Sequence, residues 1–344
     1  MPPLTETLAG RRLQALPALS KPGSRRVDYI GLRCPECKAN LAAMSYQALG
    51  KTQEAIECRE CSALMAQERG IWLALAEDRE KHFAEFIRSY EAVRKSEGRG
   101  SEDRQFYLSL PYRDRTGRNS WQWTIRAHTY KYIERKVLPE TKRHGSQALS
   151  VLDLGAGNGW LSYRLASLGH RPIAVDLQTN VFDGLGAAIH YQHALPMPFP
   201  RFRAELDRLP FASRQFDCAI FNASFHYSEN YDSTLAEALR CVRVSGRIVI
   251  ADTPFYTHDA YGQQMLRERR KFFQQQFGFP SDSLASSEYL TPERLAVLEA
   301  RHNLQWKTHD VWYGFRWACR PLVATLRRRR EPAKFRIYTA QVRP

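Results

Sequence analysis

The sequence predicts an α/β protein in which a doubly wound, mostly parallel sheet follows a small metal-binding segment near the N-terminus. Three observations support this prediction. Short apolar runs alternate with helical periodicity after residue 150, three glycines at alternate positions follow the first of these runs, and four cysteines form two matched pairs earlier in the chain. Strands separated by helices indicate a parallel sheet that is covered on both faces.

Length and composition set the outer limits. The chain has 344 residues, 43% of them hydrophobic, which is enough for one large domain and a smaller one. No run reaches the roughly 18 apolar residues needed to span a bilayer, and no signal-peptide pattern opens the chain, so we expect a cytoplasmic protein with a flexible arm over residues 1–28. The net charge of +15 falls mainly in residues 1–150 and 261–344. These basic flanks suit an anionic partner such as RNA, a phospholipid surface or an acidic small molecule, or they only aid solubility.

The paired cysteines are typical of a zinc site. Two residues separate Cys34 from Cys37, and two separate Cys58 from Cys61. Each pair can direct both sulfurs at one centre, and four thiolates complete a tetrahedral zinc site with no open position, which makes the ion structural. A redox pair is the alternative, but redox chemistry has little need of a second matched pair.

The surrounding segments LRCPECKANL and IECRECSALM resemble the small zinc ribbon that is a partner subunit of, or is fused to, tRNA and rRNA methyltransferases. Such ribbons often carry glycine after the second knuckle, where this chain has Ser62. We assign residues 29–75 to the ribbon.

The remaining elements are expected in the following order. A linker helix and connection occupy residues 76–118, with apolar residues at helical spacing from Phe83 to Val93, and the main domain covers 119–344. Its first helix starts near Asn119 or Ser120 and stops at Pro139. The later elements are listed by range: strands at Ser150–Leu154, Pro172–Asp176, Phe216–Asn222 and Arg247–Asp252; helices at Leu161–Leu168, at Leu235–Val242 with Asp232 as cap, over 265–276, from Thr291 to Arg301, and before Arg327–Arg330; and a final strand at 335–342.

The glycine loop Asp153-Leu154-Gly155-Ala156-Gly157-Asn158-Gly159 follows the first main-domain strand. Glycines lack the β-carbons that would block a ligand at the carboxyl ends of the strands. A dinucleotide fingerprint would have its last glycine where this chain has Trp160, which disfavours a dehydrogenase. The loop instead resembles the signature of class I methyltransferases that use S-adenosylmethionine, and this resemblance implies their Rossmann-like fold.

Two later landmarks fit the same resemblance. Asp176 ends the next strand, where a carboxylate can accept hydrogen bonds from both ribose hydroxyls. The segment from Glu205 to Phe211 resembles that of the type 11 methyltransferases, and by register Glu205 takes the position of the adenine-contacting acid, with Asp207 as a rival. The resemblance implies these cofactor-binding residues: Asp153, Gly155, Ala156, Gly157, Gly159, Asp176, Leu177, Glu205, Leu206 and Asn222.

Candidate catalytic residues follow the strand that ends at Asn222. His226 resembles the type 11 histidine that faces the acceptor, and we expect it to act as a base or only to pack the pocket, with Tyr227 beside it. The insertion 178–200 holds His190, Tyr191 and His193, which could contact an acceptor or pack the loop. The expected function is methyl transfer to a small or lipid-like molecule. An RNA methyltransferase and a non-enzymatic scaffold are the alternatives.

Overall fold

The computed structural model describes residues 29–51, 55–141, 148–279 and 283–343. The arm expected over residues 1–28 lies outside this described part. Among the described residues, no helix has both the length and the apolar character needed to cross a membrane.

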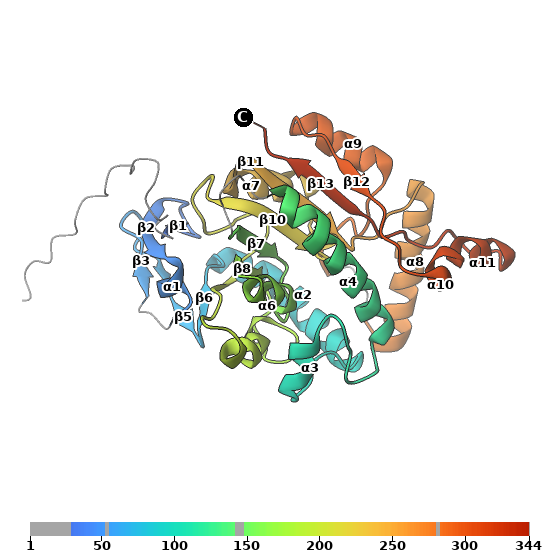
Figure 1. Ribbon diagram of the computed structural model, residues 1–344, viewed down its shortest axis with the longest axis horizontal. Coiled ribbons are helices and arrows are strands. Elements are labelled where there is room, and N and C mark those ends of the chain that lie inside the picture. The colour runs from blue at the N-terminus through green and yellow to red at the C-terminus, as the bar shows by residue number, and fades with distance from the viewer. Residues whose placement is uncertain (1–28, 52–54, 142–147, 280–282, 344) are drawn as a thin grey trace, which may run out of the picture.

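A nine-stranded sheet organises the molecule (Figure 1). The strands from β11 to β6 run parallel, whereas β13 is antiparallel to both of its neighbours and β5 is antiparallel at the far edge. This order confirms the expected doubly wound, Rossmann-like fold of class I methyltransferases. In spatial order the strands are β12 (Lys307–His309), β13 (Ile337–Gln341), β11 (Val242–Ala251), β10 (Phe216–Asn222), β7 (Ser150–Leu154), β8 (Arg171–Asp176), β9 (Arg201–Arg203), β6 (Ile71–Leu73) and β5 (Gln67–Glu68).

Helices cover both faces of the sheet, and each face has its own hydrophobic core. Successive residues of β7 alternate between the two cores: Leu152 and Leu154 belong to one, and Val151 belongs to the other. The strands are therefore apolar on both sides, which explains why they read as continuous apolar runs. The helices packed around the sheet are α2 (Glu77–Ser96), α3 (Arg104–Ser109), α4 (Ser120–Tyr132), α6 (Trp160–Ser167), α7 (Tyr231–Cys241), α8 (Asp259–Phe277) and α9 (Pro292–Arg301).

Two expected helix boundaries are wrong. Pro139 does not stop the helix, because α4 continues through a π-helical turn, η1 (Ile133–Val137), into α5 (Leu138–Thr141), which contains the proline. The cap of α7 is Asn230, not Asp232, because the Asn230 side chain accepts hydrogen bonds from two backbone N–H groups of the first turn. Thr291 caps α9, which ends at Arg301 as expected.

The cysteine-rich segment packs directly onto the main core. It contains β1 (Tyr29–Arg33), β2 (Asn40–Ser45), α1 (Tyr46–Leu49), β3 (Ile56–Glu57) and β4 (Leu64–Met65). Leu32 is fully buried and forms a bridge with Phe211, and the Tyr46 hydroxyl donates to the Pro172 carbonyl at 2.8 Å. The strands β5 and β6, which fall inside the expected ribbon segment, join the large sheet instead. The ribbon and the main domain therefore share one hydrophobic core.

Candidate functional site

The glycine loop turns sharply between β7 and α6. Its first two amides, at Gly155 and Ala156, both donate to the Val175 carbonyl of β8, at 2.8 and 3.0 Å. All three glycines have positive φ angles, so each occupies the left-handed region that suits glycine. A β-carbon at Gly155 would lie 2.2 Å from that of Ser224, and one at Gly159 would lie 3.1 Å from the Phe199 ring. Close packing of the chain itself therefore accounts for two of the glycines.

Gly157 differs from the other two glycines. A β-carbon there would make only an ordinary contact, 3.5 Å from the Asp183 carbonyl. Gly157 lines a cavity at the carboxyl ends of the strands, and its N–H donates to Asp176 Oδ2 at 2.8 Å. The expected role of glycine, a close approach of backbone to ligand, therefore applies best at this position.

The cavity brings together eight of the ten cofactor-binding residues implied by the resemblance. The two that do not line it are Gly159 and Glu205. The eight come from the ends of β7, β8 and β10 and from the segment after β9, which is where a doubly wound sheet binds its ligands. They are Asp153, Gly155, Ala156, Gly157, Asp176, Leu177, Leu206 and Asn222.

The donors and acceptors in this cavity fit a nucleoside that carries an amino acid group. Asp176 accepts one backbone hydrogen bond on each carboxylate oxygen, from Gly157 and Gln178, and each oxygen keeps a lone pair for a ribose hydroxyl. Asn222 Oδ1 and Gln178 Oε1 are buried acceptors without a hydrogen-bond partner among the described residues. Unpaired buried acceptors call for donors from a ligand.

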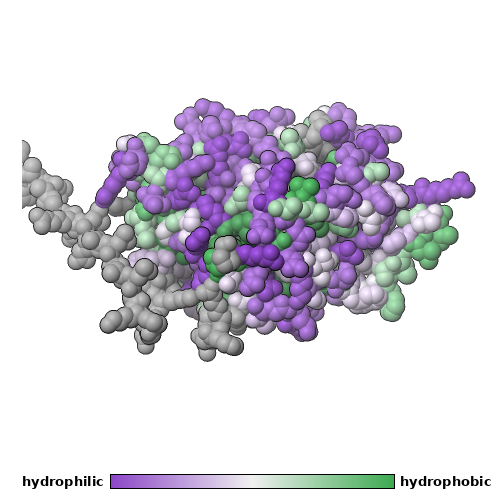
Figure 2. Space-filling model, turned by 90° about the horizontal axis from the view of Figure 1, so that it is seen from above, coloured by the Kyte–Doolittle hydropathy of each residue, from purple (hydrophilic) through white to green (hydrophobic). Residues whose placement is uncertain are grey.

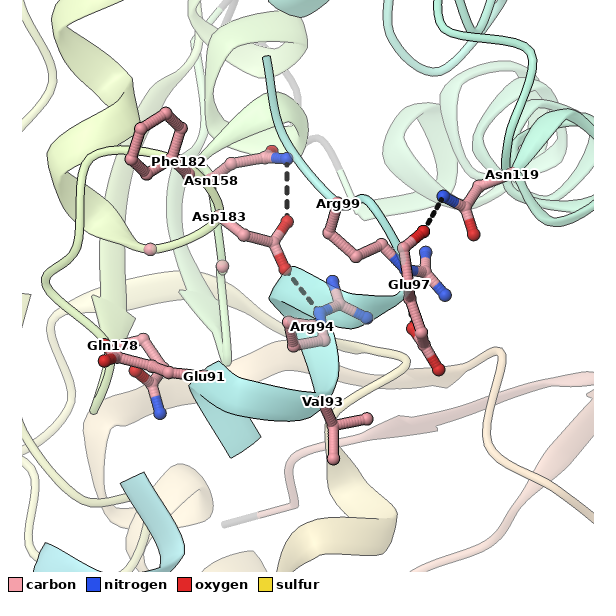
Figure 3. Close-up of polar contacts among 12 residues, drawn as sticks. Glu91, Val93, Arg94, Glu97, Arg99, Asn119, Asn158, Gln178, Phe182 and Asp183 are labelled. Carbon is pink, nitrogen blue, oxygen red and sulfur yellow. Dashed lines mark hydrogen bonds and ion pairs between the residues drawn. The ribbon is translucent and has the colours of Figure 1, made fainter. Parts of the chain in front are cut away.

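Helix α2 closes one side of the cavity, which the sequence alone did not indicate. Tyr90 and Arg94 line the cavity, and Arg94 pairs with Asp183 in the loop after β8 (Figure 3). Asp183 also accepts from the Asn158 side chain at 3.4 Å, and Asn180 donates to Glu91 at 3.0 Å. The beginning of the 178–200 insertion is therefore tied to α2.

The other part of that insertion forms η2 (Leu185–Ala194). There His190 stacks on Tyr107 at 4.2 Å, and Tyr191 is buried against Tyr163. Neither residue lines this cavity or the larger one that adjoins it. Both residues pack within the protein, which is the second of the two roles expected for this insertion.

Glu205 lies outside the cavity and faces the start of α2. Its buried carboxylate accepts from Arg79 Nε at 2.8 Å, and Arg208 lies 3.5 Å away. Burial, with the nearby Asp207 carboxylate, raises the pKa of Glu205 to about 7 despite the Arg79 guanidinium. The neighbouring Ala204 and Leu206 do line the cavity.

A second, larger cavity of about 600 Å³ adjoins the first, and both are lined by Tyr227, Tyr90 and Arg126. This volume is in the range of small-molecule sites. His226 lines the larger cavity, in η3 (Phe225–Tyr227), and its buried Nδ1 has no hydrogen-bond partner among the described residues. The two candidate catalytic residues therefore sit where an acceptor next to the first cavity would lie.

The environment changes what His226 can do. Burial, reinforced by the Arg269 and Arg126 guanidinium groups, lowers the pKa of His226 to about 3. His226 is therefore neutral at physiological pH. A neutral imidazole can accept a hydrogen bond, but with this pKa it is a weak base.

Asp252 is an acidic residue of the larger cavity that no sequence motif indicated. It directly follows β11 with a positive φ of 51°, an unfavourable conformation for a non-glycine residue. Its Oδ1 accepts from Thr129 at 2.6 Å, while the buried Oδ2 has no partner among the described residues. Burial raises the pKa of Asp252 to about 6. The strained backbone at a strand end was not visible in the sequence pattern.

The four paired cysteines meet at one point. Their sulfur atoms all lie within 4.8 Å of one another, and Cys34 to Cys61 and Cys37 to Cys58 are each separated by 3.6 Å. Zinc–sulfur bonds of about 2.3 Å in a tetrahedron place sulfurs about 3.8 Å apart, so the donor set fits zinc. Lys38 and Ser62 follow the two knuckles with matching positive φ angles of 63° and 56°. The absence of glycine at Ser62 therefore does not prevent the turn.

Comparisons with known proteins find relatives that are named as methyltransferases. Malonyl-[acyl-carrier protein] O-methyltransferase from Buchnera aphidicola subsp. Baizongia pistaciae (strain Bp) is 26% identical over 106 residues, which are 30% of this chain and 39% of that protein. The enzyme of the same name from Erwinia pyrifoliae (strain DSM 12163 / CIP 106111 / Ep16/96) is 27% identical over 135 residues, 39% of this chain and 48% of that protein. The chain thus matches less than half the length of either relative.

Among solved structures, the YcgJ protein from Bacillus subtilis aligns with a TM-score of 0.45 at 12% identity, covering 60% of this chain and 97% of that one. The match to a protein family is more local and contains the glycine loop, Asp176 and the end of β10. Residues 152–250 match the family described as methyltransferase domain.

Proposed function

We propose that the protein is an S-adenosylmethionine-dependent methyltransferase that acts on a small or lipid-like acceptor. The observation that supports this best is the convergence of eight resemblance-implied residues on one cavity that adjoins a second, larger one. Two adjoining cavities suit a reaction in which a donor and an acceptor must be held in line. The family match over residues 152–250 supports the same activity.

On the cofactor side, Asp176 would accept the ribose hydroxyls, and Asn222 and Gln178 would accept donors elsewhere on the nucleoside. Gly157 would let the backbone approach the ligand closely. The bound cofactor supplies an electrophilic methyl group on a sulfonium. Phe86, Tyr90 and Tyr227 line that cavity, and aromatic faces attract such a cation.

On the acceptor side, Tyr227 stands at the junction of the two cavities. Asp252, with a pKa raised to about 6, is mostly ionised at neutral pH and would serve as the base if the acceptor carries a proton. His226 would then position the acceptor by accepting a hydrogen bond. Both groups have one unpartnered buried atom among the described residues, which leaves that atom free for a substrate.

The relatives favour a small or lipid-like acceptor, because their names describe O-methylation of a malonyl group on a carrier protein. An RNA acceptor depends on the ribbon resemblance and the basic flanks alone. The two alternatives differ in salt dependence, since RNA binding through many phosphates weakens steeply with salt, whereas binding of a small acceptor with at most one anionic group changes little.

Calorimetry with S-adenosylhomocysteine tests the activity proposal. We expect one site per chain, and Asp176→Ala should weaken binding at least tenfold, because two hydrogen bonds to a charged group are worth about 3 kcal/mol or more. Asp310→Ala is the control, since Asp310 is exposed at the far edge of the sheet. Absence of binding to the wild-type protein would refute the proposal.

We further propose that Cys34, Cys37, Cys58 and Cys61 hold one structural zinc ion. Elemental analysis should find one zinc per chain, and Cys61→Ser should abolish it. Because the ribbon shares the main core, metal removal should also lower the melting temperature of the whole protein. Exchange of the buried Cys218, which is remote from the cluster, should leave the zinc content unchanged. A metal-free wild type with the same melting temperature would contradict the zinc assignment.

A further inference from the structure

The larger cavity contains an unusual number of arginines. Five of them line it, against two acidic residues, Glu97 and Asp252; the five are Arg94, Arg99, Arg126, Arg269 and Arg320. Resting on the function proposed above, we infer that the acceptor carries a carboxylate or phosphate group and that Arg126 binds it.

Four of the five arginines already have partners. Arg94 pairs with Asp183, and Arg99 pairs with Glu97 at 2.9 Å. The other two are also engaged. Arg269 pairs with Glu288, and Arg320 donates to the Ala333 carbonyl at 3.1 Å while lying over the Trp317 ring. These side chains are held in place by the protein, although Arg99 Nη1 is buried without a hydrogen-bond partner among the described residues.

Arg126 is the exception. It projects from α4 with its guanidinium 4.9 Å from the centre of the Trp123 ring, and it lines both cavities. No carboxylate of the described residues lies within 4.0 Å of it. Burial, with repulsion from Arg94 and Arg99, lowers the pKa of Arg126 to about 10, so it remains charged at physiological pH. Arg126 is half-buried, and a cation that faces a cavity with no counter-ion beside it is stabilised when a ligand supplies the anion.

The nearest acid does not fill that role. Asp252 influences Arg126 electrostatically, but one of its oxygens accepts from Thr129, and no ion pair joins the two side chains. Arg126 and Asp252 therefore present opposite charges to the same space. An acceptor with an anionic group on the Arg126 side and a proton to lose on the Asp252 side satisfies both.

The remaining wall indicates what the anion is attached to. Aromatic rings from α2, α4, α8 and the C-terminal segment surround the space, which suits an aromatic or other apolar body. They include Phe86, Trp121, Phe273, Phe279, Trp317 and Phe335. The acceptor class is therefore an apolar molecule that bears one carboxylate or phosphate.

Binding of matched probes tests this inference. In the presence of saturating S-adenosylhomocysteine, titration with benzoate, phenyl phosphate and the neutral benzamide should show binding of an anion but not of the amide. The stronger anion then identifies the preferred group. Arg126→Gln should weaken anion binding at least about tenfold, since a charge-assisted bidentate contact is lost. Arg135→Gln is the control and should leave anion binding unchanged, because Arg135 is exposed in η1, which continues α4.

The outcomes separate the two proposals. If S-adenosylhomocysteine does not bind, the methyltransferase proposal fails. If it binds but benzamide binds as well as both anions, or Arg126→Gln keeps the preference for an anion, the acceptor inference is wrong. The melting temperature and circular dichroism spectrum of the Arg126→Gln variant show whether it is folded.

A separate observation concerns the segment 312–330, which we call the C-terminal tip. It contains α10 (Phe315–Ala318) and α11 (Arg320–Leu326), neither of which has a buried residue. Large apolar side chains are exposed there: Trp312 is 59%, Phe315 80%, Leu322 63% and Leu326 75% exposed. Figure 2 shows hydrophobic side chains gathered at the right-hand end of the molecule, where Figure 1 places α11. An exposed apolar cluster of this kind marks an interaction surface.

The charge of the tip indicates the partner. Its sequence contains six arginines and no acidic residue. Arg327, Arg328 and Arg329 are exposed directly after the apolar residues of α11, whereas Arg330 is paired with Glu268. Apolar side chains beside clustered cations favour the surface of an anionic bilayer over a neutral protein face.

We propose that the tip binds the surface of anionic membranes. Trp317 and Arg320 of the tip also line the larger cavity, so membrane binding would bring that cavity to the lipid surface. An apolar anionic acceptor could then enter from the bilayer.

Vesicle sedimentation tests the proposal with the full-length protein. Binding should be strong to phosphatidylcholine vesicles that contain phosphatidylglycerol, absent with phosphatidylcholine alone, and weaker at high salt. Replacing Arg327, Arg328 and Arg329 together with Gln should weaken vesicle binding about a hundredfold. The double substitution Leu322→Ser and Leu326→Ser should weaken it at least about tenfold. Val297→Ser, an exposed residue of α9, is the control. Absence of binding to the anionic vesicles, or a dimer in light scattering that the Leu322 and Leu326 exchanges dissociate, would overturn the proposal.

Discussion

Gly157→Ala should show whether Gly157 is required for cofactor binding or only for the stability of the fold. Gly157 and Gly117 both have positive φ angles, 54° and 73°. A methyl group at Gly117 would meet nothing within 4 Å, and one at Gly157 would make a single ordinary contact. Each exchange therefore costs about 1–2 kcal/mol of stability, the penalty for a left-handed alanine. Only Gly157 lines the cofactor cavity, so only Gly157→Ala should also weaken cofactor binding.

The expected loss of affinity follows from crowding a close contact. Overpacking by one methyl group costs about 1–3 kcal/mol, which corresponds to roughly five- to 150-fold weaker binding. Calorimetry with S-adenosylhomocysteine and thermal melting of both variants measure the two effects. Gly155→Ala should destabilise more than either, since its methyl group would overlap Ser224. Wild-type affinity in Gly157→Ala, or an equal loss in Gly117→Ala, would show that the loop does not hold the cofactor.

Two further exchanges test the charged groups around the cavities. Burial raises the pKa of Asp252 from 3.8 to about 6, so its ionisation destabilises the folded state as pH rises between these values. Asp252→Asn should therefore have a higher melting temperature than wild type at pH 8, and the difference should disappear near pH 4. A difference in melting temperature that is the same at both pH values would contradict this reasoning. Asp183→Asn should leave Arg94 buried without its partner, lowering stability by about 3 kcal/mol and weakening cofactor binding, whereas Lys81→Gln, in a fully exposed ion pair, should leave the melting temperature unchanged.

The parts of the site that could be predicted are those encoded locally. The position of the glycine loop, including Asp153, and that of Asp176 at the end of β8 follow from the hydrophobic runs that predict β7 and β8. Because parallel strands end at the same edge of the sheet, adjacent strand ends place these residues together. The cysteine knuckles are local in the same sense, since their spacing alone brings each pair of sulfurs together.

The parts that could not be predicted depend on contacts between distant segments. The pairing of β6 with β9 joins residues about 130 positions apart, and nothing in the sequence of residues 70–75 indicates that this segment extends the large sheet. Tyr90 and Arg94 continue the apolar spacing of α2 by one and two turns after Phe86, a pattern that also describes ordinary packing. Arg126 lies in an aromatic helix, and only its lack of a partner in three dimensions distinguishes it from a surface arginine.

The position of α2 suggests that the cysteine knuckles influence the cofactor cavity. The first residue of α2, Glu77, donates its backbone N–H to Glu36 Oε1 at 3.0 Å, and Glu36 lies between Cys34 and Cys37. The residue at the N-cap position of α2, Ala76, offers no side-chain cap. Glu36 therefore caps the helix from the first knuckle, while the other end of the helix holds Asp183 through Arg94.

Glu36→Ala should therefore loosen α2 and weaken S-adenosylhomocysteine binding, although Glu36 touches neither cavity. Loss of a helix cap costs about 0.5–2 kcal/mol. If this cost destabilises the position of α2 that closes the cavity, cofactor affinity falls by up to roughly thirtyfold. Glu60 occupies the same position in the second knuckle and caps no described helix, so Glu60→Ala is the matched control. Both variants should retain their zinc. If they bind cofactor equally well, α2 does not connect the knuckles to the cavity; if only Glu36→Ala is weakened, the ribbon is part of the machinery that closes the cofactor site.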